Sequence, residues 1–221
     1  MTYNEIIKKL KSLKNQKNID GMARFGINPK NTLGISIYDL RKIAKEIGKD
    51  HNLALQLWDS GIHEAKILAS FVDEPEKVTE EQLEKWVLDF DSWDIVDQVS
   101  ELIAHTPFVI KKIFEWSDRP EEFVKRSAFS LIAEVSWWDK KMTDKEIEKF
   151  FPIIKKAATD ERNFVKKAVN WALRNIGKRN AYLHKKAITL AKELKTSKSK
   201  SARWIGSDAL RELEKRNPAP I

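Results

Sequence analysis

Hydrophobic residues recur every three or four positions along almost the whole chain, which is the spacing of amphipathic α-helices. Segment 163–178 shows this most clearly, because a rotation of about 100° per residue gathers its apolar residues into one stripe. The stripe consists of Val165, Ala168, Val169, Ala172, Leu173 and Ile176. No alternating pattern typical of a strand occurs, so the chain predicts about eleven or twelve helices of about 10 to 17 residues.

Capping residues and helix breakers mark the ends of the predicted helices. The predicted start signals are Ser36, the capping boxes Thr79–Gln82 and Thr143–Glu146, the N-cap Ser92, and Pro107 and Pro120 near a first turn; the predicted end signals are Gly48 and Gly177. Short helices in one continuous run favour stacked helical hairpins over a closed bundle, although no strict motif period is visible. We therefore predict an all-α fold, an α-solenoid forming a single curved domain over residues 1–221.

The charge balance favours a polyanionic partner. The 221 residues carry 41 Lys and Arg against 33 Asp and Glu, a net charge of +8, together with eight Trp and ten Phe. Cations and aromatic rings are what nucleic acid needs for binding and stacking. A lysine-rich proteome or a hot habitat is the alternative explanation. The basic segment Lys195–Ser201 is expected to be a loop that is solvated or touches phosphate.

Several other chemistries are excluded by the sequence. Without cysteine there is no disulfide, thiolate nucleophile or Cys-ligated metal, and the four scattered His show no metal-ligand spacing. We therefore expect no metal and no cofactor. The N-terminus lacks the apolar core of a signal peptide, and no apolar run approaches the roughly 20 residues that span a bilayer. We expect a cytoplasmic protein that does not act at a membrane.

Trp171 lies about 130° from the centre of the apolar stripe of its helix. Its neighbours on that side are Lys167, Arg174 and Lys178. A large aromatic residue among cations suggests stacking on nucleic acid or against a cationic ligand. The alternative is that this second face of the helix packs on another helix.

Two further helices carry polar or aromatic residues away from their core stripes. In the helix predicted from Trp93 to Ala104, Trp93 and Asp97 share one face outside the apolar stripe. They form a small site, or Trp93 covers the helix start and Asp97 is an ordinary surface acid. In the helix predicted over 120–137, Arg126 points away from the stripe among small or apolar residues. It is expected to bind phosphate, to pair with Asp97, or to form an interhelical ion pair.

These residues fall in blocks that resemble the AlkD-like DNA alkylation repair family, the HEAT-like repeat DNA glycosylases. The blocks are FDSWDIVDQVS at 90–100, EEFVKRSAFSLIAE at 121–134, DERNFVKKAVNWALRNIGKRN at 160–180, and GMARFGINPKNTLGISIYDLRKIAK at 21–45. The resemblance implies HEAT-like repeats and a concave basic groove for DNA. It also implies a cleft in which Asp97 is the catalytic carboxylate, Trp93 and Trp171 pack against the lesion sugar, and Arg126 holds the backbone.

We therefore predict a DNA repair hydrolase, a monomer that binds alkylated duplex DNA. It would cleave the N-glycosidic bond of cationic N-alkylated purines of the 3-methyladenine and 7-methylguanine type, and the resemblance does not require the base to be flipped into a pocket. Weaker candidates for contacts to the DNA backbone are Lys167, Arg174, Lys178 and Arg179. The alternatives are a non-catalytic binder of damaged or branched DNA and a HEAT-type protein-interaction scaffold.

Overall fold

Every regular element in the computed structural model, which describes residues 1–215, is an α-helix. The helices are α1 (Tyr3–Ser12), α2 (Gln16–Arg24), α3 (Ile37–Ile47), α4 (His51–Asp59), α5 (His63–Val72), α6 (Glu80–Leu88), α7 (Trp93–Ile103), α8 (Val109–Ser117), α9 (Glu122–Trp138), α10 (Asp144–Glu148), α11 (Phe150–Ala157), α12 (Asn163–Arg179), α13 (Ala181–Lys195) and α14 (Lys200–Leu213). The all-α prediction is confirmed. The described residues form more helices than expected, and α10 has only five residues.

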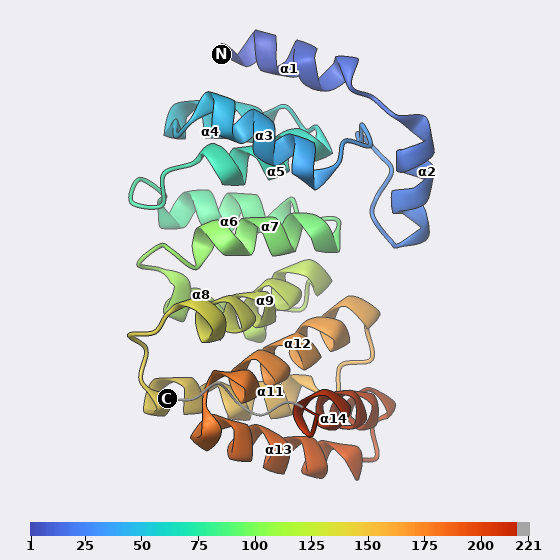
Figure 1. Cartoon of the computed structure of the whole chain (residues 1–221), viewed down its shortest axis with the longest axis vertical. Helices are drawn as coiled ribbons and strands as arrows, with labels where there is room; N and C mark the ends of the chain where they lie inside the picture. Colours follow the sequence, from blue (N-terminus) through green and yellow to red (C-terminus); the bar gives the residue numbers. More distant parts are fainter. Residues whose placement is uncertain (216–221) are drawn as a thin grey trace. The chain divides into compact units, whose positions relative to one another are not determined.

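Helix contacts divide the chain into two compact units, residues 1–108 (unit 1) and residue 109 onward (unit 2). In unit 1, α5 packs against α3, α4 and α7, and in unit 2, α12 packs against α9, α11, α13 and α14. Within each unit most successive helices are joined by short connections, and the loop of residues 25–36 between α2 and α3 is the long exception (Figure 1). This arrangement is that of helical hairpin repeats. The single domain over residues 1–221 stays a prediction.

Polar contacts between successive layers keep a regular sequence spacing within each unit. In unit 1 the hydrogen bonds Leu33–Glu64, Trp58–Asp89 and His63–Asp94 each join residues 31 positions apart. In unit 2 the spacing is 38 in the pairs Asp118–Lys156, Arg126–Phe164, Glu148–Lys186, Glu161–Ser199, Asn170–Asp208 and Arg174–Glu212. A structural repeat with no strict sequence motif is therefore revealed by the constant spacing between contacting residues.

The predicted core stripes are confirmed. All six stripe residues of α12 are fully buried. The apolar stripes predicted for the other two helices are buried as well, on α7 Ile95, Val96, Val99, Leu102 and Ile103, and on α9 Val124, Ala128, Leu131, Ile132 and Val135. Three of the eight tryptophans also belong to the core, namely Trp58, Trp86 and Trp116. Trp58 and Trp86 stack with their ring centroids 4.0 Å apart. These rings are not available to nucleic acid, which weakens the compositional argument for base stacking.

Most predicted helix starts are confirmed. The Ser36 side chain caps α3, Gly48 follows its last residue with φ 80°, and Thr143 forms the full capping box with Glu146. Ser92 is the N-cap of α7, but its hydroxyl accepts the backbone N–H of Asn28 instead of one from the helix. Pro107 and Pro120 each lie two residues before the helix that follows.

One predicted helix end and one capping box are wrong in part. Thr79 caps α6, but the Gln82 side chain donates to Asp73 Oδ2 at 2.6 Å instead of returning to the cap. Gly177 lies inside α12, which continues to Arg179. A Cβ atom at Gly177 would lie 2.8 Å from the Leu213 side chain, so the glycine permits close packing of α14 rather than ending a helix.

The predicted basic loop 195–201 is shorter than expected. It spans residues 196–199, because α13 ends at Lys195 and α14 begins at Lys200. Ser199 caps α14, and the guanidinium of Arg203 donates to the carbonyls of Ser197 and Lys198. These hydrogen bonds satisfy backbone groups of the turn with side chains of α14 and its N-cap.

We expect opposite effects from alanine at two helical glycines. A Cβ atom at Gly206 would lie 2.5 Å from the backbone of α13, so Gly206→Ala should lower the free energy of unfolding by about 2–3 kcal/mol. Nothing lies within 4 Å of a Cβ atom at Gly21 in α2, so Gly21→Ala should raise it by about 0.5–1 kcal/mol. Urea denaturation measures both. Equal effects of the two substitutions would contradict the packing described for α13 and α14.

Candidate functional site

Trp93 and Asp97 lie one turn apart at the start of α7, and both are half-buried. The Trp93 indole Nε1 donates to the backbone carbonyl of Phe25 at 3.1 Å. The residues just before α7 are tied to the loop after α2, because the Asn28 side chain donates to Asp91 Oδ2 at 2.7 Å. The Trp93 ring is thus fixed by its polar edge, and its face is not used for this anchoring.

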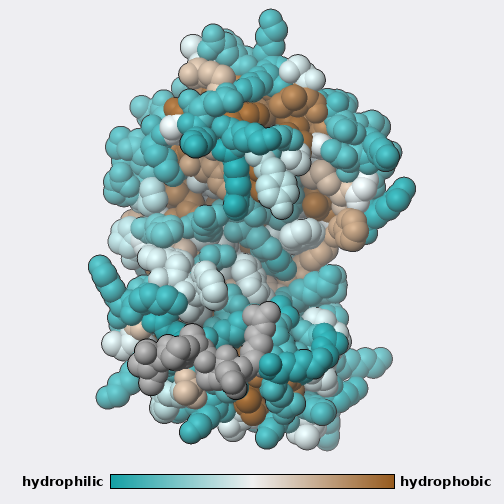
Figure 2. All heavy atoms as spheres, in the orientation of Figure 1, coloured by the Kyte–Doolittle hydropathy of each residue, from teal (hydrophilic) through white to brown (hydrophobic). Residues whose placement is uncertain are grey.

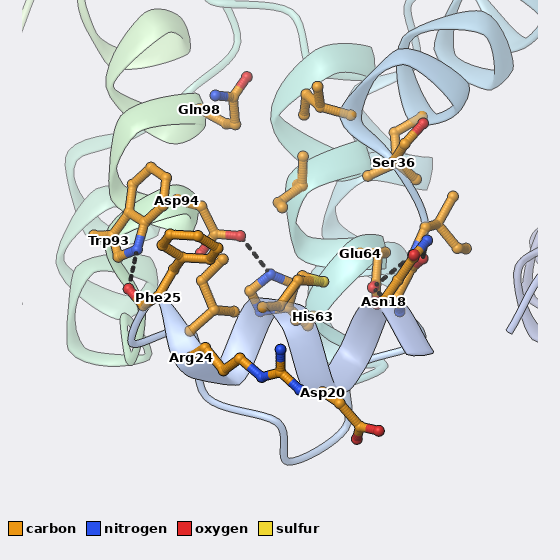
Figure 3. A pocket seen from close by; sticks show the side chains of 18 of the residues that line it. Asn18, Asp20, Arg24, Phe25, Ser36, His63, Glu64, Trp93, Asp94 and Gln98 are labelled. Atoms are coloured by element: carbon orange, nitrogen blue, oxygen red, sulfur yellow. Dashed lines mark hydrogen bonds and ion pairs between the residues drawn. The ribbon is translucent and has the colours of Figure 1, made fainter. Parts of the chain in front are cut away.

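A cavity of about 840 Å³ lies beside Trp93 within unit 1 (Figure 3). It is bounded by α2, by the loop that joins α2 to α3, and by the N-terminal parts of α3, α5 and α7. Apolar side chains line much of it, among them Met22, Ile27, Ile35, Leu40 and Ile67. Its size is that of a pocket for a small organic group.

Two buried ionisable residues at the start of α5 line the cavity. Glu64 is 0% exposed, and its carboxylate accepts the backbone N–H groups of Leu33, Gly34 and Ile35 at 2.8, 2.6 and 3.2 Å. His63 is 3% exposed, and its Nε2 lies 2.8 Å from Asp94 Oδ2. Glu64 therefore holds the loop, while His63 and Asp94 form a polar pair beside the cavity.

Burial lowers the pKa of His63, but the hydrogen bond that His63 donates to Asp94 and the charges of Asp94, Glu64 and Asp91 outweigh it. The net result is a pKa above the ordinary value of 6.5. A hydrogen-bonded carboxylate favours the charged imidazolium in this way.

Arg126 lies in an enclosed position, as its small and apolar neighbours predicted. It is 5% exposed, and its Nη1 donates to the carbonyl of Phe164 in the first turn of α12 at 2.8 Å. Asn175 Nδ2 and Arg179 Nη1 of α12 likewise donate, at 3.1 Å each, to carbonyls of α9, those of Ala133 and Ser136. These bonds fix α9 beside α12, and the phosphate role of Arg126 stays a prediction.

Trp171 is half-buried on α12, outside the fully buried stripe. Its indole makes no hydrogen bond within residues 1–215. Lys167, one turn earlier, is exposed and forms no ion pair with any residue in that range. The two side chains leave an aromatic ring and a cation on the same face of the helix.

The other three basic residues of α12 that are candidates for DNA contacts are occupied by contacts inside unit 2. Arg174 and Lys178 are both ion-paired with Glu212 of α14, and Arg174 also lies 3.6 Å from Asp208. Arg179 donates to the carbonyls of Ser136 and Met142. Of the four basic residues proposed for DNA contacts, Lys167 is therefore the strongest candidate.

The candidate residues fall into two groups. Trp93 and Asp97 belong to unit 1, and Arg126 and Trp171 to unit 2. Trp93 and Asp97 lie one turn apart on α7, and Arg126 is bonded to the first turn of the helix that carries Trp171. Convergence of the four residues stays a prediction.

Reasoning from the sequence missed the cavity and its His63–Asp94 pair. None of the four His has ligand spacing along the chain, whereas this pair depends on the 31-residue spacing between layers. Among the described residues, no group of three or more His, Asp or Glu could hold a metal ion. None of the described helices is long and apolar enough to span a membrane.

The His63–Asp94 pair makes stability depend on pH. Because folding raises the pKa of His63, the pair stabilises fully below pH 6.5, and this stabilisation is lost as the pH rises through the raised value. His63→Gln should therefore cost about 2 kcal/mol at pH 5.5 and clearly less at pH 9. Urea denaturation at the two pH values measures the difference. Asp94→Asn should remove the same pH-dependent part, and a cost independent of pH would contradict the ion pair.

Comparisons with known proteins agree with the resemblance read from the sequence. The chain is 26% identical to the uncharacterized protein Lin0241 of Listeria innocua, over 88% of this chain and 87% of that protein. It is 25% identical to the uncharacterized protein Lmo0209 of Listeria monocytogenes, with the same coverage. A solved structure, from a family related to the HEAT-like repeat DNA glycosylases with affinity for branched DNA structures, superposes with a TM-score of 0.81 at 18% identity, covering 96% of this chain and 95% of that one. This match shows the HEAT-like fold. The family model described as DNA alkylation repair enzyme matches residues 6–213, and the chain belongs to this family.

Proposed function

We propose that the protein binds duplex DNA and hydrolyses the N-glycosidic bond of cationic N-alkylated purines such as 3-methyladenine and 7-methylguanine. The observation that carries the proposal is the pairing of Trp93 with Asp97 on one face at the start of α7, with the indole anchored by Phe25. Membership of the DNA alkylation repair family supports the same conclusion.

The chemistry suits a site with one carboxylate. An N-alkylated purine already carries positive charge, so its bond to the sugar is weakened and departure of the base needs little acid catalysis. The Asp97 carboxylate would stabilise the positive charge that develops on the sugar and position the water that attacks it. The faces of Trp93 and Trp171 would add cation–π attraction as that charge grows.

Binding of DNA would depend on cations that the fold leaves available. Lys167 meets this condition, and it lies one turn from Trp171. Arg126, which is buried and held by a backbone carbonyl, would present its guanidinium to phosphate or to Asp97 in a fixed orientation.

Non-catalytic binding of branched or damaged DNA is the second candidate function. It is favoured by the family whose solved structure shares this fold, since that family has affinity for branched DNA structures. Binding without release of base would distinguish it from the first.

We expect Asp97→Asn to slow release of methylated purine from alkylated duplex DNA by about 10²–10³-fold, because the stabilising charge is lost while the side chain keeps its size. Chromatography of the released bases under single-turnover conditions measures the rate. The matched control is Glu101→Gln, one turn further along α7, whose exposed carboxylate lies 3.7 Å from Arg41. Equal rates for wild type and Asp97→Asn would remove the role of Asp97, and no release by either would favour the second candidate function.

Neutralising Lys167 should weaken DNA binding more than neutralising Lys178. Lys167→Gln is expected to lower affinity about 3–10-fold and to reduce the slope of log affinity against log salt by about one, since one phosphate contact is lost. Lys178→Gln, three turns away on the same helix, should change neither quantity, because its charge is paired with Glu212. Fluorescence anisotropy of labelled duplex at several salt concentrations tests this, and equal losses would contradict the assignment.

A further inference from the structure

The unit 1 cavity combines apolar walls with aromatic rings at its edge. Trp93 lines it, and Phe25, whose carbonyl anchors the Trp93 indole, is 75% exposed at the end of α2. The close-up shows both rings on one side of the cavity, with His63 further along it (Figure 3). In the space-filling view, apolar residues are visible at the surface of unit 1 among hydrophilic ones (Figure 2). An exposed phenylalanine beside a fixed indole is suited to stacking on a flat ring.

The polar pair in the cavity has bonding capacity left over. Asp94 uses Oδ2 for His63, and its Oδ1 is buried without a hydrogen-bond partner in the described part of the chain. The Nδ1 atom of His63 also has no partner among residues 1–215. The pair thus leaves a buried, unpaired carboxylate oxygen beside an imidazole nitrogen at the wall of the cavity. A nucleobase edge presents donors and acceptors side by side and complements such a pair.

Cations stand at the same cavity. Lys17 and Arg24 of α2 line it, both are exposed, and neither forms an ion pair within residues 1–215. A nucleotide of DNA brings a phosphate next to its base, so these cations complement it. The cavity volume of about 840 Å³ accommodates a base together with its sugar.

We propose that this cavity receives a nucleobase that has left the base stack of DNA, with its ring against Phe25 and Trp93 and its edge at His63 and Asp94. The proposal rests on the DNA binding proposed above but not on base excision. Trp93 is shared between the cavity and the Trp93–Asp97 site, so an unstacked base beside Trp93 can enter without crossing into unit 2. The cavity would thereby select DNA in which a base is unpaired or easily unstacked.

Gly21 provides a substitution that fills the cavity and spares the fold. It lines the cavity from α2, and nothing lies within 4 Å of a Cβ atom placed there. Gly21→Leu therefore starts an aliphatic side chain from a Cβ position in open space at the cavity wall, and Gly21→Ala is the matched control that leaves most of the space open. Both variants favour the helical backbone more than glycine does.

The test compares the affinity of the full chain for two duplexes, one with a single unpaired 2-aminopurine and one fully paired. Wild type and Gly21→Ala should bind the unpaired-base duplex about ten-fold more tightly, as stacking of one base predicts. Gly21→Leu should lose this preference to within about two-fold and keep its affinity for the paired duplex. A competition arm uses the free deoxynucleoside monophosphate of 2-aminopurine, which should displace the duplex poorly.

Several outcomes would overturn the proposal. The first is that wild type does not prefer the unpaired-base duplex, and the second is that Gly21→Leu shows the same preference as wild type. The third is that the free nucleotide displaces the labelled duplex as effectively as the unpaired-base duplex does. That third result would make a free nucleotide the occupant of the cavity. Because base release is not measured, failure of excision leaves the proposal standing. Loss of the preference with paired-duplex binding intact overturns only the cavity, whereas absence of binding to either duplex overturns the proposed function as well.

Discussion

The architecture around the cavity depends on the hydrogen bonds that the buried carboxylate of Glu64 accepts from the backbone. A charged group without access to water is costly unless strong hydrogen bonds replace its hydration. Here three consecutive backbone N–H groups, those of Leu33, Gly34 and Ile35, supply them. The chain between α2 and α3 is therefore held against α5, and that loop and α2 form one side of the cavity. Replacement of Glu64 by an apolar residue would leave three buried donors unsatisfied.

Helix α12 explains why an aromatic residue stands outside its core stripe. One face is the apolar stripe, which is fully buried. Other positions carry polar side chains that meet neighbouring helices, Asn175 toward the carbonyls of α9 and Arg174 toward the acids of α14. Trp171 and Lys167 remain outside these contacts. The apolar stripe of α12 and most of its cations therefore already have partners in neighbouring helices, and Trp171 lies outside these contacts.

The sequence could predict features that depend on neighbours within one helix. The stripes of α7, α9 and α12 and most capping residues follow from local spacing, and the enclosed position of Arg126 follows from Phe129, Ser130 and Ala133 around it. Features that depend on contacts between layers were not accessible. The glycine at 177 predicts a helix end, whereas its role is set by the close contact with Leu213, which is tertiary. Arg174 and Lys178 looked like free cations because their partner Glu212 lies in another helix. The His63–Asp94 pair joins two different helices and is inaccessible to local patterns for the same reason. Local patterns also do not predict whether Trp93 and Asp97 of unit 1 lie near Arg126 and Trp171 of unit 2.

The anchoring of α2 has a thermodynamic consequence for the cavity beside it. Helix α2 makes few contacts with other helices, and its end is tied to α7 through the hydrogen bond from Trp93 to Phe25. An element of this kind opens locally at a lower free energy than the core. A ligand that bridges α2 and α5 would suppress that local opening of α2. Ligand binding would therefore stabilise the closed α2, and a closed α2 would raise the affinity for the ligand by the same coupling free energy. Slower hydrogen exchange of the α2 backbone amides would then reveal a bound ligand even when the ligand itself gives no spectroscopic signal.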